Sequence, residues 1–221
     1  MIQKSSEALS RRAFLGMAGA ATGMMVLASS CSKNDDDNMM NNGVDLGSGD
    51  VGILNYAYAL EQLEAAFYTR VAQSPYNGIS ASENALLTDI RDHEIAHREF
   101  FKSALAGAAI SNLEFDFSAV DFSSRASVLA TAKAFEDLGV SAYNGAGKLI
   151  VTPDYLTLAG KIVSVEARHA AYIRDLISNG SFADNTVVDM NGLDTSRMPA
   201  DVLAVAAGFI KTKINASNLP R

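Results

Sequence analysis

Apolar residues recur along this chain at alternating spacings of three and four, which places them on one face of an α-helix. The pattern predicts four long helices, at about residues 50–73, 82–107, 124–150 and 153–179, and a short fifth helix that begins at Pro199. Residues that cap helices support three of these starts: Asp50, Ser82 and Thr152, which Pro153 follows at the first helical position. We therefore expect a protein built from helices.

The connection between the second and third helices is much longer than a tight turn. It covers about 16 residues, 108–123, which suits a crossover along the length of a bundle. No convincing βαβ pattern and no glycine-rich phosphate-binding loop interrupts the helices. The predicted fold is all-α: a four-helix bundle with one long crossover and a short C-terminal helix packed outside it.

Each long helix carries one line of apolar residues, its seam, along the face predicted to be buried. Polar residues interrupt each seam near its middle, forming a polar layer, and in all four helices the first of them is a glutamate. The four residues are Glu61, Glu94, Glu136 and Glu166. A tyrosine follows seven residues later in the first and third helices, and a histidine follows three residues later in the second and fourth. These residues are Tyr68, Tyr143, His97 and His169. The first and third seams match at an offset of 75 residues and the second and fourth at 72, which indicates a duplicated helix pair.

The position of these glutamates predicts a metal centre. Between leucine, isoleucine, phenylalanine and alanine they would be buried, where an unpaired carboxylate costs several kcal/mol, so they are not ordinary residues of an exposed face. None of the four seams contains a lysine or arginine, whereas two divalent cations would balance four carboxylates. Glu and His three residues apart lie about one helical turn apart on the same side. Carboxylate and imidazole donors suit iron, manganese or zinc, and the oxygen-rich set favours iron or manganese.

Composition and charge exclude other kinds of site. The only cysteine is Cys31, so neither an internal disulfide nor a multi-cysteine zinc or iron–sulfur site can form. The formal net charge is −7, from 18 basic and 25 acidic residues, and no basic stripe is present. We therefore expect no binding to nucleic acid.

The first 31 residues predict export. A basic start and the uncharged stretch 13–30 precede Cys31, as in a bacterial signal sequence. The segment Ser10-Arg11-Arg12-Ala13-Phe14-Leu15 resembles a twin-arginine signal, and Leu27-Ala28-Ser29-Ser30-Cys31 resembles a lipoprotein processing site, in which Cys31 is lipidated and attaches the protein to a membrane. A simple hydrophobic anchor is the alternative.

The expected domain organisation follows from this leader. Residues 1–31 are the export signal, the polar and repetitive residues 32–49 are a flexible tether, and residues 50–215 form the folded domain. We expect a periplasmic or cell-envelope lipoprotein.

The polar layer also resembles a known family. One glutamate from each of two helices, with Glu-x-x-His from each of two others, is the ligand pattern of ferritin-like di-metal carboxylate proteins. The segments 55–68 and 91–97 are similar to bacterial ferritin-like and desiccation-related proteins, and the resemblance covers about residues 50–215. It implies that the metal ligands are Glu61, Glu94, His97, Glu136, Glu166 and His169.

The resemblance implies a function as well. Members of this class react with oxygen or peroxide as oxidases, peroxidases or catalases, and act in protection against oxidative stress. The alternative is a metal-binding or structural stress protein without turnover. Iron storage is the least favoured of the three functions. It needs a closed cage of subunits, and a lipidated tether on each subunit would hinder assembly of such a cage.

Several neighbours of the polar layer have roles that the sequence leaves open. Glu64 lies beside the histidines, and its counterpart in the repeat is Gly139. Glu64 is a terminal ligand in place of Glu61, a carboxylate that shifts during turnover, or an acceptor that orients a histidine, and we favour the last. We expect Tyr68 and Tyr143 to be core aromatics whose hydroxyls bond ligand carboxylates, with radical or electron-transfer chemistry as the alternative. His93 falls off the seam and is interpreted as a solvated or supporting histidine.

Overall fold

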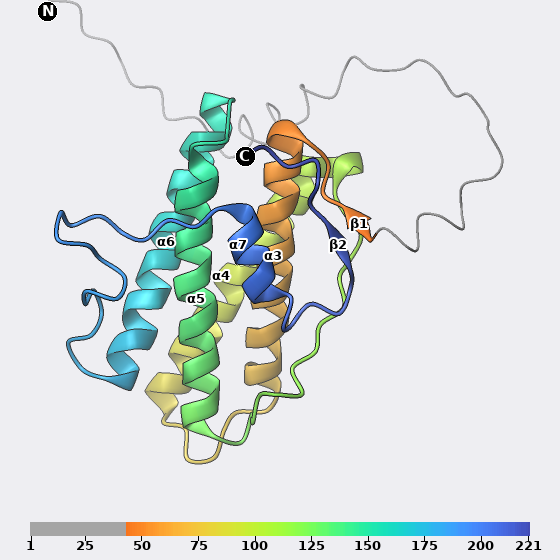
Figure 1. Ribbon diagram of the computed structural model, residues 1–221. Helices are drawn as coiled ribbons and strands as arrows, with labels where there is room; N and C mark the ends of the chain where they lie inside the picture. The colour runs from red at the N-terminus through yellow and green to blue at the C-terminus, as the bar shows by residue number, and fades with distance from the viewer. Residues whose placement is uncertain (1–42) are drawn as a thin grey trace, which may run out of the picture. The chain divides into compact units, whose positions relative to one another are not determined.

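The computed structural model describes residues 43–221 and is mostly helical (Figure 1). The long helices are α3 (Gly49–Gln73), α4 (Ala81–Leu105), α5 (Arg125–Gly147) and α6 (Pro153–Ile177), followed by the short α7 (Pro199–Ala206). A 3-10 turn, η1 (Ala106–Ala108), and two short strands, β1 (Val44–Asp45) and β2 (Ile214–Asn215), complete the elements. The predicted export signal and residues 32–42 of the predicted tether lie outside the described residues. The expected all-α four-helix bundle is confirmed.

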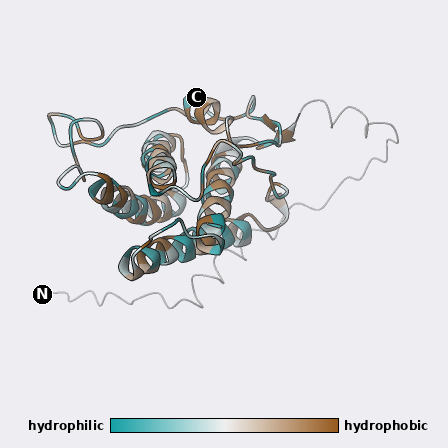
Figure 2. Ribbon diagram, turned by 90° about the horizontal axis from the view of Figure 1, so that it is seen from below, coloured by the Kyte–Doolittle hydropathy of each residue, from teal (hydrophilic) through white to brown (hydrophobic). Residues whose placement is uncertain are grey.

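Two antiparallel helix pairs form the bundle. Helix α3 packs mainly against α4, and α5 packs mainly against α6. The crossover returns the chain along the bundle, so α5 begins at the same end as α4 (Figure 1). Seen along the helices, the four surround a common interior and α7 lies outside them, against α5 (Figure 2). Within residues 43–221, no helix is long and apolar enough to cross a membrane.

Two of the predicted helix caps are wrong. The cap of α4 is Ser80 and not Ser82, because the Ser80 side chain accepts a 3.1 Å hydrogen bond from the Glu83 amide in a capping-box sequence. Asp50 lies inside the first turn of α3, and its carboxylate accepts hydrogen bonds from the Val151 and Thr152 amides at 2.8 and 2.9 Å. Asp50 therefore joins the start of α3 to the start of α6.

Buried side-chain amides on α3 hold the crossover. Asn55 donates to the Ala108 carbonyl at 2.9 Å and accepts from the Ile110 amide at 2.9 Å. About two turns further along α3, the Gln62 side-chain oxygen accepts from the Leu113 amide at 2.9 Å. These bonds satisfy backbone groups that would otherwise be buried without partners, and they fix the crossover along α3.

Residues 44–49 do not form the flexible tether that we expected for 32–49. Strand β1 pairs in parallel with β2, and Leu46 is fully buried. Asn55 also donates to the Leu46 carbonyl, at 3.1 Å. Burial of one apolar side chain and pairing with the C-terminal strand hold this segment to the domain, so the folded part begins before Asp50.

A buried arginine anchors the segment that leads from α6 to α7. The Arg174 guanidinium donates to the carboxylates of Asp137 at 2.6 Å and Asp184 at 2.7 Å, and to the Ser181 carbonyl at 3.1 Å. Further along, the Arg197 carbonyl crosses α5 so closely that a Cβ atom on Gly145 would lie 1.7 Å from its oxygen. Gly145 is therefore required for the chain to reach α7.

We expect Gly145→Ala to destabilise the domain by about 1–3 kcal/mol, because the new methyl group collides with backbone rather than with a flexible side chain. Gly160→Ala in α6 is the matched control. It has open space around it, so improved helix propensity should stabilise the domain by up to about 1 kcal/mol. Denaturant unfolding of both variants measures the two effects. Equal stability of the two variants would contradict the close approach at Gly145.

Candidate metal centre

The six side chains predicted as ligands converge at the centre of the bundle. They form two groups of potential metal-binding atoms, each within 4.8 Å of one another. The first group is Glu61, Glu94, His97 and Glu166, and the second is Glu94, Glu136, Glu166 and His169. Glu94 and Glu166 belong to both groups, and they come from α4 and α6. Each group thus has one histidine and one glutamate of its own and shares the other two glutamates.

The donor atoms approach one another without bonding to one another. His97 Nδ1 lies 2.8 Å from Glu166 Oε1, and His169 Nδ1 lies 2.8 Å from Glu94 Oε1. These four atoms nevertheless lack hydrogen-bond partners, because the ring N–H groups do not point at the oxygens. All four glutamates are 0% exposed. Buried donor atoms that face a common point without partners are what a divalent metal would satisfy, so the residues present fit such an ion.

Electrostatics place protons on the histidines when no cation is present. Burial lowers the pKa of His97, but its contacts with Glu166, Glu61 and Glu94 outweigh this effect and raise the pKa to about 12. His169 behaves in the same way, with a pKa of about 12 caused by three carboxylates that outweigh burial. Burial also raises the pKa of Glu166, yet the two histidines lower it to about 2. The site therefore attracts positive charge strongly.

The remaining carboxylates hold protons more readily than usual. Burial, with a contribution from the charge of Glu166, raises the pKa of Glu94 to about 8. Burial likewise raises the pKa of Glu136 to about 7 and raises that of Glu61. A metal that binds here must displace these protons, and the histidine protons with them.

The two tyrosines bond reciprocally across the bundle. The Tyr68 hydroxyl on α3 donates to Glu136 Oε1 on α5, and the Tyr143 hydroxyl on α5 donates to Glu61 Oε1 on α3. Burial and the nearby carboxylates raise the pKa of both tyrosines well above the ordinary value, so both hydroxyls keep their protons and donate. The tyrosine hydroxyls bond candidate ligand carboxylates, as we expected. Each hydrogen bond leaves the second oxygen of its carboxylate without a hydrogen-bond partner among the described residues.

Glu64 lies outside both groups and faces Gly139. A Cβ atom on Gly139 would lie 3.0 Å from Glu64 Oε1, so the glycine leaves the room that this side chain fills. Burial, followed by the charges of the surrounding glutamates, raises the pKa of Glu64 well above its usual range. The geometry therefore favours Glu61, not Glu64, as the glutamate that α3 supplies to the first group.

His93 has a contact that the seam pattern did not predict. Its Nδ1 lies 2.9 Å from Nε2 of His169, with the two rings nearly parallel and their centroids 5.1 Å apart. The signal in the sequence was a third histidine beside the Glu-x-x-His motif of α4, but spacing along one helix does not show which residue of α6 it meets. Cys31, the predicted lipidation site, lies outside the described residues.

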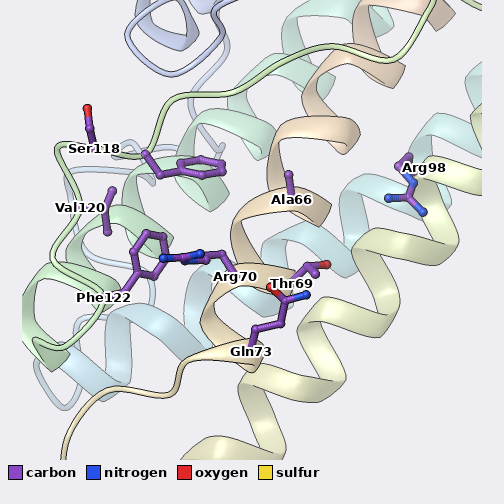
Figure 3. Close-up of a pocket in the computed structure, with 9 residues that line it drawn as sticks. Ala66, Thr69, Arg70, Gln73, Arg98, Ser118, Val120 and Phe122 are labelled. Carbon is purple, nitrogen blue, oxygen red and sulfur yellow. The ribbon is translucent and has the colours of Figure 1, made fainter.

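A separate pocket of about 670 Å³ is lined by residues of α3, α4 and the crossover (Figure 3). Its lining includes Arg70, Arg98, Phe117 and Phe122. The Arg70 guanidinium carbon lies 5.4 Å from the centre of the Phe122 ring. None of the six side chains described above lines this pocket, so it is distinct from the candidate metal centre.

We expect Glu61→Gln and Glu64→Gln to differ in metal content. Glu61→Gln removes an anionic donor from the first group and should lower metal content, whereas Glu64→Gln should leave it unchanged. Glu166→Gln should lose the most metal, because Glu166 belongs to both groups. Elemental analysis of metal-loaded, folded variants decides this. If Glu64→Gln loses metal and Glu61→Gln retains it, the other carboxylate of α3 is the ligand.

Comparison with known proteins agrees with this geometry. A family model described as a ferritin-like domain matches residues 49–179, which is more than half of the chain and includes all six side chains. A search of curated proteins finds no match. The bundle, the crossover and the paired Glu-x-x-His motifs lead to the same conclusion as the family match: this chain belongs to the ferritin-like domain family.

Proposed function

We propose that this chain is an exported di-metal protein of the desiccation-related kind, which holds two iron or manganese ions and reacts with oxygen or peroxide in protection against oxidative stress. The observation that carries the proposal is the sharing of Glu94 and Glu166 by two otherwise separate ligand groups. Shared carboxylates hold two ions close together, which is the arrangement suited to two-electron chemistry on a small molecule. Carboxylate-rich donor sets with imidazole favour iron or manganese.

The bundle supplies orientation and exclusion of water. When bound, the metal ions supply the redox chemistry. Tyr68 and Tyr143 hold Glu136 and Glu61 in place, and the surrounding apolar side chains keep bulk water from the carboxylates. Six side chains do not fill the coordination of two ions that prefer five or six ligands each, so positions remain for a small substrate.

A small cavity next to Tyr143 agrees with a small substrate. It holds about 20 Å³, enough for one water-sized molecule, and is lined mainly by apolar residues between α3 and α5. Tyr143, which bonds Glu61, and Leu60, which precedes Glu61, both line it. A cavity of this size and polarity suits a neutral diatomic molecule better than an organic substrate.

The proposed location rests on the leader. Residues 1–31 have the features of a twin-arginine signal and a lipoprotein processing site, with Cys31 as the lipidated residue. The twin-arginine pathway carries proteins that have already folded, which suits a protein that acquires metal before export. We therefore propose a periplasmic or cell-envelope protein that is attached to a membrane through Cys31.

We expect the reduced protein, loaded with Fe²⁺ or Mn²⁺, to react with oxygen or hydrogen peroxide. Glu94→Ala should abolish the reaction, because Glu94 belongs to both ligand groups. Glu99→Ala, which removes an exposed carboxylate from the same helix, is the matched control and should react like the unaltered protein. Stopped-flow absorbance after mixing with each oxidant measures the effect.

Absence of any reaction with either oxidant, for both metals, would contradict the proposed chemistry. In that case the non-catalytic metal-binding or structural stress protein becomes the better interpretation. A reaction of equal rate in Glu94→Ala would place the chemistry outside this centre.

A further inference from the structure

The contact between His93 and His169 determines which ring nitrogen of His169 is available to a metal. His169 Nδ1 faces the carboxylates of Glu94, Glu136 and Glu166 at 2.8 to 3.5 Å. Its other nitrogen, Nε2, lies 2.9 Å from His93 Nδ1. If Nδ1 of His169 held a metal, the ring proton would lie on Nε2, which would donate a hydrogen bond to Nδ1 of His93. The two ring planes are nearly parallel and the rings meet edge to edge, so this contact would hold the orientation of His169 as well as its tautomer.

Among residues 43–221, the structure shows no hydrogen bond between His97 and another histidine. The second and fourth seams match at an offset of 72 residues, which relates His97 to His169 and Glu94 to Glu166. The same offset relates His93 to Val165. A valine side chain neither donates nor accepts a hydrogen bond. Val165 of α6 therefore cannot give His97 the ring-nitrogen contact that His93 of α4 gives His169. The His97 side chain is also the more exposed of the two, at 13% against 6%.

We infer that the two metal positions are unequal and that His93 is the positioning residue that makes them so. The position formed by the second ligand group, which contains His169, binds its metal more tightly and fills first. Preorientation of His169 by His93 removes the cost of fixing that ring, whereas His97 must be fixed as the metal binds. This inference rests on the proposed metal centre but not on its reactivity with oxygen.

Titration of the metal-free protein with Co²⁺, followed by d–d absorbance and calorimetry, tests the inference without any turnover. We expect two dissociation constants for the unaltered protein. His93→Ala should weaken the tighter one by about 10- to 100-fold and bring it close to the weaker one. His93→Asn should restore most of the difference, because its side-chain oxygen can accept the proton of His169 Nε2. Val165→Ala is the matched control and should leave both constants unchanged.

Replacing a glutamate that belongs to only one ligand group shows which dissociation constant belongs to which metal position. Glu61→Gln should spare the tighter constant, and Glu136→Gln should spare the weaker one. Two equal constants in the unaltered protein, or an unchanged tighter constant in His93→Ala, would overturn the inference. Failure to bind Co²⁺ at all would overturn the metal centre itself. Lack of reaction with oxygen in a protein that shows two unequal constants would contradict only the proposed function.

Discussion

The four glutamates of the candidate metal centre repel one another inside an apolar core, where they are cut off from water. The arrangement of the bundle's interior depends on how their negative charge is balanced. Glu61, Glu94, Glu136 and Glu166 are 0% exposed. Without a cation, the histidines remain protonated and several carboxylates take up protons, as the pKa values of about 12 for His97 and His169 and about 8 for Glu94 indicate. Two divalent cations would replace those protons and balance the four charges in full. The same burial that makes the empty site costly therefore makes it selective for cations.

Precise placement of these side chains comes from contacts at a distance from the centre and from two tyrosines within it. Asn55 and Gln62 fix the crossover along α3, and Asp50 joins the beginnings of α3 and α6. Tyr68 and Tyr143 tie α3 and α5 to each other through the carboxylates themselves. The bonds of Asp50, Tyr68 and Tyr143 connect the two helix pairs, so that side chains from four helices meet at one place.

The parts of this structure that follow from local rules were predictable from the sequence. The seam spacing placed six side chains toward one interior, since helical periodicity alone determines which face a residue occupies.

Contacts that depend on another part of the chain were not predictable. Leu46 belongs to the core only because β1 meets β2 near the other end of the sequence. His93 meets His169 because of the rotation of α4 against α6, which a one-helix pattern does not specify. Ser80 rather than Ser82 caps α4 because the Ser80 hydroxyl accepts from the Glu83 amide. The Ser-x-x-Glu spacing that signals such a cap was present in the sequence and was misread.

The central claim is that metal ions take the place of protons among buried carboxylates and histidines. Titration of metal-free protein with Mn²⁺ in weakly buffered solution at neutral pH, with metal uptake and proton release recorded together, tests it most directly. We predict uptake of two ions per chain and release of at least one proton from each of His97 and His169, with affinity that falls as the pH is lowered. Saturation of a folded protein without stoichiometric uptake, or uptake without proton release, would contradict it.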